Sequence, residues 1–188
     1  IRKLAVKSGQ VAVPRDNRWH RKETALLGGV GIFSATIIAW FSGALWAGWS
    51  AFGQPYLPMV LCASGIFLLG LADDVFNMDP QHKLAGQVII TAILLFFGFR
   101  LGWTDSKTLD LFFSILWIVG ITNAFNLLDN MDGLSCGIAF IAGAFLFLYH
   151  CLNPSPDAFS TPGLLLLSTY LGSILGFLVY NFTPPSIF

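Results

Sequence analysis

Long apolar runs separated by short polar segments form the main pattern along this chain. Six runs follow a polar first segment, and they span approximately 27–51, 57–72, 84–101, 109–127, 134–152 and 162–182. Most approach the ~20 residues that an α-helix needs to cross a bilayer. The runs lack the two-residue alternation that a β-barrel requires. The pattern therefore predicts an all-α, polytopic integral membrane helix bundle with about six transmembrane helices.

Composition supports a membrane location. Of the 188 residues, 55% are hydrophobic and 11% are charged, whereas soluble domains carry roughly a quarter charged residues. The three cysteines lie in apolar runs without paired spacing, which favours neither a disulfide nor a zinc site. We interpret residues 1–188 as a single membrane domain.

Charge distribution predicts the orientation of this domain. Six crossings place four polar segments on one side of the membrane, namely the basic head 1–26, the loops 73–83 and 128–133, and the end 183–188. Eight of the ten basic residues lie on that side: Arg2, Lys3, Lys7, Arg15, Arg18, Arg21, Lys22 and Lys83. Cytoplasmic loops carry an excess of Lys and Arg, so this side is predicted to be cytoplasmic.

The depth of the charged residues bears on function. None of the six runs has an ionisable residue near its middle, where pumps and proton-coupled carriers usually place one. The pattern therefore argues against a transporter and against a protease with intramembrane aspartates.

The first polar motif is "PRDNRWHRKETALLGG", from Pro14 to Gly29. Its positive charge is typical of a cytoplasmic anchor, with Trp19 at the headgroup level. Cationic side chains such as His20 and Arg21 beside a Gly-Gly helix entry could equally bind an anion such as phosphate. Both interpretations stay open.

The second motif is "LADDVFNMDPQHKLAGQ", from Leu71 to Gln87. Adjacent carboxylates at Asp73 and Asp74 repel each other unless a cation or a shared proton relieves them, and magnesium is the usual cation in nucleotide chemistry. Asp79 followed by a proline is predicted to cap the next helix. Lys83 and Gln87 lie one turn apart and can present one polar face near the pair.

The third motif is "NAFNLLDNMDGL", in which Asn123, Asn126, Asp129 and Asp132 recur every three residues. The directions in which these four side chains point drift by about 180° along a straight helix, so they cannot all face one ligand. We therefore expect the helix to open near Gly133. An all-oxygen set of amides and carboxylates suits magnesium or manganese rather than zinc or copper. Alternatively, the asparagines bond neighbouring helices and the aspartates cap loops; for Asn123 this is a serious rival.

These three motifs, in this order, resemble the polyprenyl-phosphate N-acetylhexosamine-1-phosphate transferase superfamily of WecA-like and MraY-like enzymes. The resemblance covers essentially the whole chain, and "RWHRKETALLGG" and "NMDGL" look closer to the WecA-like branch.

The resemblance implies a magnesium-dependent glycosyl-1-phosphate transferase, a phosphotransferase of the bacterial inner (plasma) membrane with its active face in the cytoplasm. Such an enzyme transfers an N-acetylhexosamine-1-phosphate, here expected to be GlcNAc-1-phosphate, from a UDP-amino sugar to a polyprenyl phosphate such as undecaprenyl phosphate. UMP is released, and the lipid-diphosphate-sugar feeds cell-envelope polysaccharide synthesis. Mg²⁺ is the expected cofactor, with Mn²⁺ as a substitute.

Motif matching also implies roles for individual residues. The expected catalytic residues are Asp73, Asp74 and Lys83. The expected metal ligands are Asn126 and Asp73. The expected substrate-binding residues are Arg21, His20, Asn123, Asp129 and Asp132.

One departure from the family pattern stands out. Family members continue after the last helix with a segment that carries a metal-binding aspartate, whereas this chain reads "PPSIF" up to Phe188. We therefore expect an incomplete portion of the enzyme, inactive by itself.

Two other functions remain as alternatives: a membrane carrier or channel with a cytoplasmic carboxylate vestibule, and a scaffold subunit without chemistry. No nucleic-acid partner is expected, and a homodimer is left open.

Overall fold

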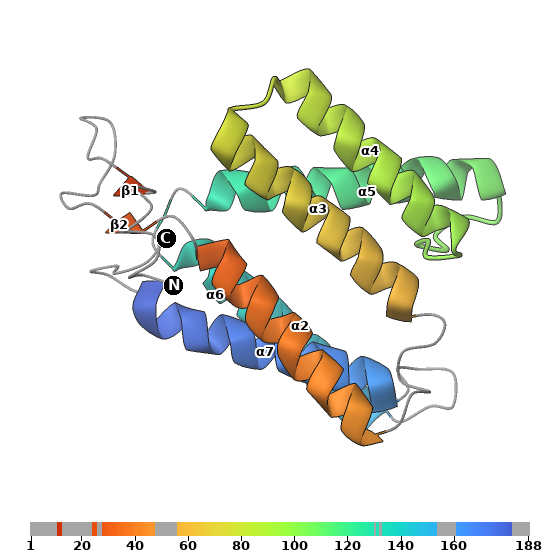
Figure 1. Ribbon diagram of the computed structural model, residues 1–188. Helices are drawn as coiled ribbons and strands as arrows, with labels where there is room; N and C mark the ends of the chain where they lie inside the picture. Colours follow the sequence, from red (N-terminus) through yellow and green to blue (C-terminus); the bar gives the residue numbers. More distant parts are fainter. Residues whose placement is uncertain are drawn as a thin grey trace. The chain divides into compact units, whose positions relative to one another are not determined.

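A computed structural model describes residues 11–12, 24–25, 28–47, 56–129, 131, 133–153 and 161–181. The helices are α2 (Gly28–Ala47), α3 (Tyr56–Phe76), α4 (Pro80–Phe96), α5 (Lys107–Leu128), α6 (Leu134–Leu152) and α7 (Thr161–Asn181) (Figure 1). Two short strands, β1 (Val11–Ala12) and β2 (Thr24–Ala25), pair antiparallel. The predicted all-α class is confirmed.

Four helices in the described part of the chain are long and apolar enough to cross a membrane: α3, α5, α6 and Gly163–Asn181 of α7. Such a set makes this a multi-pass membrane protein. The helix α4 has 17 residues, and at 1.5 Å per residue it is several ångströms shorter than a ~30 Å hydrocarbon core. Its first turn is polar, so the apolar part of α4 is shorter still.

The chain divides into two compact units, which we describe separately. The first unit comprises Ile1–Ala51 and Leu128–Phe188, and the second comprises Phe52–Leu127. The single domain proposed from the sequence stays a prediction.

In the second unit, α3 and α4 form a tight helical hairpin (Figure 1). The helix α3 ends because Asn77 adopts a left-handed conformation with φ 48°, and its N–H still donates to the Asp73 carbonyl at 2.8 Å. Asp79 caps α4 as predicted, since its carboxylate accepts from the Gln81 N–H at 3.3 Å and a proline follows.

This hairpin corrects the predicted loop 73–83, because most of that segment is helical and the connection covers only residues 77–79. The predicted apolar run stops at residue 72, whereas α3 continues to Phe76. The reason is that Val75 and Phe76 continue the run past the two aspartates. As a result Asp73 and Asp74 lie on the last turn of α3, and Lys83 lies on the first turn of α4.

Small residues let α3 and α4 approach closely. A Cβ atom added to Gly86 would lie 2.9 Å from Leu69 Cδ2, and one added to Gly65 would lie 3.4 Å from Ile90 Cδ1. Close approach of this kind is typical of helix pairs in membranes, where van der Waals packing drives association. This close packing fixes the position of α3 relative to α4.

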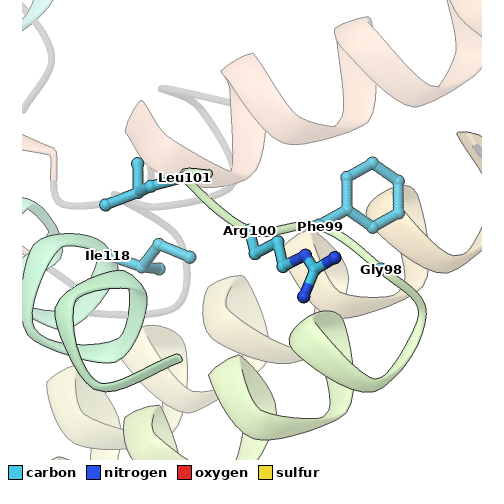
Figure 2. Close-up of a pocket in the computed structure, with 5 residues that line it drawn as sticks. All are labelled: Gly98, Phe99, Arg100, Leu101 and Ile118. Atoms are coloured by element: carbon cyan, nitrogen blue, oxygen red, sulfur yellow. The ribbon is translucent and has the colours of Figure 1, made fainter. Parts of the chain in front are cut away.

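At the other end of this unit, two buried side chains of α5 hold the preceding loop. Asp110 accepts from the Trp103 N–H at 2.8 Å, and Ser114 accepts from the Leu101 N–H at 3.0 Å. Arg100 Nε lies 4.0 Å from the second Asp110 oxygen. The loop backbone thus has partners for donors that a membrane would otherwise leave unsatisfied. An open pocket of about 350 Å³ lies beside this loop, lined by Gly98, Phe99, Arg100, Leu101 and Ile118 (Figure 2).

In the first unit, α7 packs against both α2 and α6 (Figure 1). Glycines again mark the contacts, since a Cβ on Gly43 would lie 2.9 Å from Leu165 Cδ1 and one on Gly143 would lie 2.8 Å from Leu171 Cδ2. Ile174 of α7 and Trp40 of α2 are buried in this packing.

Candidate active site

The site in the second unit is built on the ion pair between Lys83 and Asp73. The Lys83 Nζ lies 2.6 Å from Asp73 Oδ2, and the two side chains are 17% and 23% exposed. The hairpin creates this pair, because a three-residue connection brings the last turn of α3 opposite the first turn of α4. Partial burial weakens the screening by water, so the pair is stronger than a fully exposed one.

Asp74 adds a second carboxylate beside this pair. It is exposed, and it experiences repulsion from Asp73 and attraction to Lys83. Because one ammonium faces two carboxylates, the group keeps a net negative charge when all three are ionised. This charge favours binding of a further cation.

The helix α5 brings an amide to the same group. Lys83 Nζ donates to Asn126 Oδ1 at 3.5 Å, which is a long and weak contact. The second and third sequence motifs therefore meet at Lys83, which lies between a carboxylate from α3 and an amide from α5. The structure thus brings together four of the predicted residues: Asp73, Asp74, Lys83 and Asn126.

One turn deeper, Asn123 bonds a neighbouring helix. Asn123 Nδ2 donates to Gln87 Oε1 at 2.8 Å and to the Val119 carbonyl at 2.8 Å, and Gln87 Nε2 donates to Asn123 Oδ1 at 3.4 Å. This is the interhelical role considered for Asn123 as an alternative, and its role in substrate binding stays a prediction.

The remainder of the third motif belongs to the first unit. The helix opens where predicted, since α5 ends at Leu128, α6 begins at Leu134, and Gly133 has φ 68°. Asp129 follows the end of α5 and is exposed. His20, Arg21 and Asp132 lie outside the described residues, so their roles stay predictions.

A side chain that the sequence pattern did not identify holds this opening. Asn181, the last residue of α7, accepts from the Gly133 N–H at 2.8 Å and is only 6% exposed. The available signal was a polar residue at the end of an apolar run. Its partner, 48 positions away, could not be inferred from spacing.

The donor set fits magnesium chemically. The oxygens of Asp73, Asp74 and Asn126 are of the type that Mg²⁺ binds, usually together with waters and substrate phosphates. Within the described ranges, no group of three His, Cys, Asp or Glu side chains could hold a metal ion by itself. A metal here would therefore depend on the Asn126 amide and on ligands from outside these residues.

The hairpin turn gives a prediction about stability. Asn77→Val is expected to destabilise the protein by about 1–3 kcal/mol, because a β-branched residue is strained at positive φ. Asn77→Gly is expected to be tolerated, since glycine adopts this conformation freely. Thermal unfolding in detergent measures both, with Met78→Val in the same connection as the matched control. Equal stability of Asn77→Val and Met78→Val would show that the left-handed turn does not constrain the hairpin.

Comparison with known proteins places the chain in a family. Residues 56–188 match the family described as Glycosyl transferase family 4. The chain is 30% identical to a decaprenyl-phosphate N-acetylglucosaminephosphotransferase of Mycolicibacterium smegmatis, over 100% of this chain and 50% of the relative. It is 29% identical to a probable undecaprenyl-phosphate N-acetylglucosaminyl 1-phosphate transferase of Bacillus subtilis, over 100% of this chain and 52% of the relative.

A third relative is the phospho-N-acetylmuramoyl-pentapeptide-transferase of Limosilactobacillus reuteri, 33% identical over 98% of this chain and 61% of the relative. The chain spans about half the length of the first two relatives. The resemblance to the polyprenyl-phosphate N-acetylhexosamine-1-phosphate transferase superfamily is thereby confirmed, and the chain belongs to glycosyl transferase family 4.

Proposed function

We propose that the whole protein transfers an N-acetylhexosamine-1-phosphate, with GlcNAc-1-phosphate as the first candidate, from a UDP-sugar to a polyprenyl phosphate. The observation that carries this proposal is the grouping of Lys83 with Asp73, Asp74 and Asn126 at the ends of helices α3, α4 and α5. The names of the relatives specify the same class of reaction.

In the proposed reaction, an oxygen of the lipid phosphate attacks the β-phosphorus of the UDP-sugar. The bond from that phosphorus to the bridging oxygen breaks, and UMP leaves. Positioning and electrostatic stabilisation supply most of the catalysis in such transfers. The Lys83 ammonium stabilises phosphate oxygens, and the Asp73 carboxylate holds that ammonium in place. The two aspartates share the task of orienting and deprotonating the lipid phosphate.

Charge explains why the proposal includes a divalent cation. Two phosphate-bearing substrates would enter a group that already carries net negative charge, which repels them. Magnesium held by Asp73 and Asn126 would offset the charge of the diphosphate. Manganese prefers similar ligands and would substitute.

The direct test is UMP release by the whole protein from UDP-GlcNAc and undecaprenyl phosphate. We expect release that stops with EDTA and returns with Mg²⁺ or Mn²⁺. A control variant for substitutions in the site is Asp79→Asn, which changes a nearby exposed carboxylate but keeps a helix-capping side chain. It is expected to keep metal-dependent UMP release. Failure of several UDP-sugars to yield metal-dependent UMP would refute the proposal.

The excess of Lys and Arg on one side of the membrane supports an active face in the cytoplasm of the bacterial inner membrane. Cysteines introduced at exposed positions 81 and 105 test this orientation, after Cys62, Cys136 and Cys151 are replaced. Impermeant thiol reagents added outside intact cells are expected to label Asp105→Cys and to spare Gln81→Cys. The reverse labelling pattern would place the site outside.

The carrier alternative gains no support from the described helices. Their Asp, Lys and His side chains all lie in a first or last turn: Asp73, Asp74, His82, Lys83, Lys107, Asp110 and His150. Charge at the ends of helices suits a reaction at the membrane surface better than a path across the membrane.

A further inference from the structure

Gln87 is a buried polar side chain to which the proposed mechanism assigns no role. It lies on α4 and is 2% exposed. Its amide exchanges two hydrogen bonds with that of Asn123 on α5, at 2.8 and 3.4 Å. Asn123 Nδ2 donates its other hydrogen to the Val119 carbonyl at 2.8 Å. Neither amide group can flip without losing hydrogen bonds, and the loss of a hydrogen bond by a buried amide is costly.

The position of this amide pair relative to the site is informative. Gln87 follows Lys83 by four residues on α4, and Asn123 precedes Asn126 by three residues on α5. Residues at these spacings share one face of a helix. The amide pair therefore lies about one turn, roughly 5 Å, below the contact between Lys83 and Asn126.

The contact above the amide pair is sensitive to small movements. Lys83 Nζ and Asn126 Oδ1 are 3.5 Å apart, at the limit of a hydrogen bond. Rotation of α4 by one residue would turn Lys83 by about 100° away from α5. The glycine contacts fix α4 against α3, but they do not set its rotation relative to α5.

We propose that Gln87 is a positioning residue, which pairs with Asn123 to set the rotation of α4 relative to α5 and so holds Lys83 opposite Asn126. This inference rests on the proposed function for its effect on turnover. Gln87 itself does not touch the reacting phosphates; it acts through Lys83. Asn123 takes part through the same pair.

Exchange of the two amides provides the sharpest test. Gln87→Leu and Asn123→Leu in the whole protein are each expected to lower kcat for UMP release by about 10- to 100-fold, as expected for a displaced catalytic group. The double leucine variant is expected to be no slower than the worse single variant, because both changes remove one interaction. The exchange Gln87→Asn with Asn123→Gln keeps the combined length of the two side chains, and we expect it to restore kcat to within about threefold.

A matched control separates positioning from general damage to the helix. Thr91 lies one turn further along α4, is also 2% exposed, and is replaced by valine of the same shape. Thr91→Val is expected to leave kcat unchanged. Normal kcat in Gln87→Leu would overturn the proposal, as would leucine effects that multiply in the double variant.

A second measurement does not depend on activity. In a cysteine-free background, Lys83→Cys and Asn126→Cys are treated with a short bifunctional thiol cross-linker in membranes. The cross-linked yield is expected to fall when Gln87→Leu is added and to recover in the amide exchange variant. An unchanged yield would refute the positioning role even if the protein proved to have another activity. Absence of UMP release together with the expected cross-linking would refute the proposed function alone.

Discussion

Lys83→Met is expected to reduce UMP release by the whole protein by about 100- to 1,000-fold, the range seen when one preorganised donor to developing charge is removed. Methionine keeps most of the length of the side chain but removes the ammonium that lies between Asp73 and Asn126. The two aspartates would then face the substrate phosphates without a cationic side chain between them.

Stability is expected to change much less than turnover. The Lys83 side chain is 17% exposed, and a partly hydrated ion pair contributes on the order of 1 kcal/mol. Lys83→Arg keeps the charge but not the compact shape of the ammonium, so an intermediate rate is expected. Steady-state UMP release and thermal unfolding in detergent measure the two effects separately. Lys107→Met, at the start of α5, is the control. A rate within threefold of the unmodified protein would remove Lys83 from the catalytic group.

Asp74→Asn and Asn126→Ala are each expected to abolish turnover, with a loss of about 100-fold or more. The first change removes a negative charge without changing shape. The second removes the amide oxygen that contacts Lys83 and belongs to the proposed magnesium site. Both variants are expected to remain folded, because Asp74 and Asn126 are exposed. UMP release across a range of Mg²⁺ concentrations measures the effect, and Asp79→Asn again serves as the control. Normal rates in both variants would assign a purely structural role to these side chains.

Much of the fold could be predicted because apolar runs and helices coincide in a membrane protein. The order of the six helices in the described part of the chain and the cap at Asp79 followed from local patterns. The end of α3 did not, because Asn77 stops that helix through its backbone conformation rather than through a change in polarity. The hairpin then explains why Asp73 and Lys83, ten residues apart, form an ion pair.

The long-range partners could be predicted only in part. Helical spacing placed Lys83 and Gln87 on one face, and the tendency of amides in membrane helices to bond a neighbouring helix raised an interhelical role for Asn123. Neither observation could identify Gln87 as the partner. Asp110 and Ser114, which hold the loop before α5, and Asn181, which holds Gly133, went unrecognised. Each bonds a backbone N–H whose need for a partner appears only once the chain has folded.

The fate of the β-phosphate tests the central claim most directly. The whole protein is incubated with undecaprenyl phosphate and UDP-GlcNAc labelled with ³²P at the β-phosphorus, and the lipid and nucleotide products are separated. Transfer of GlcNAc-1-phosphate carries the label into the lipid and leaves unlabelled UMP, which is the predicted result. Transfer of the sugar alone would leave the label in UDP, and that result would contradict the account.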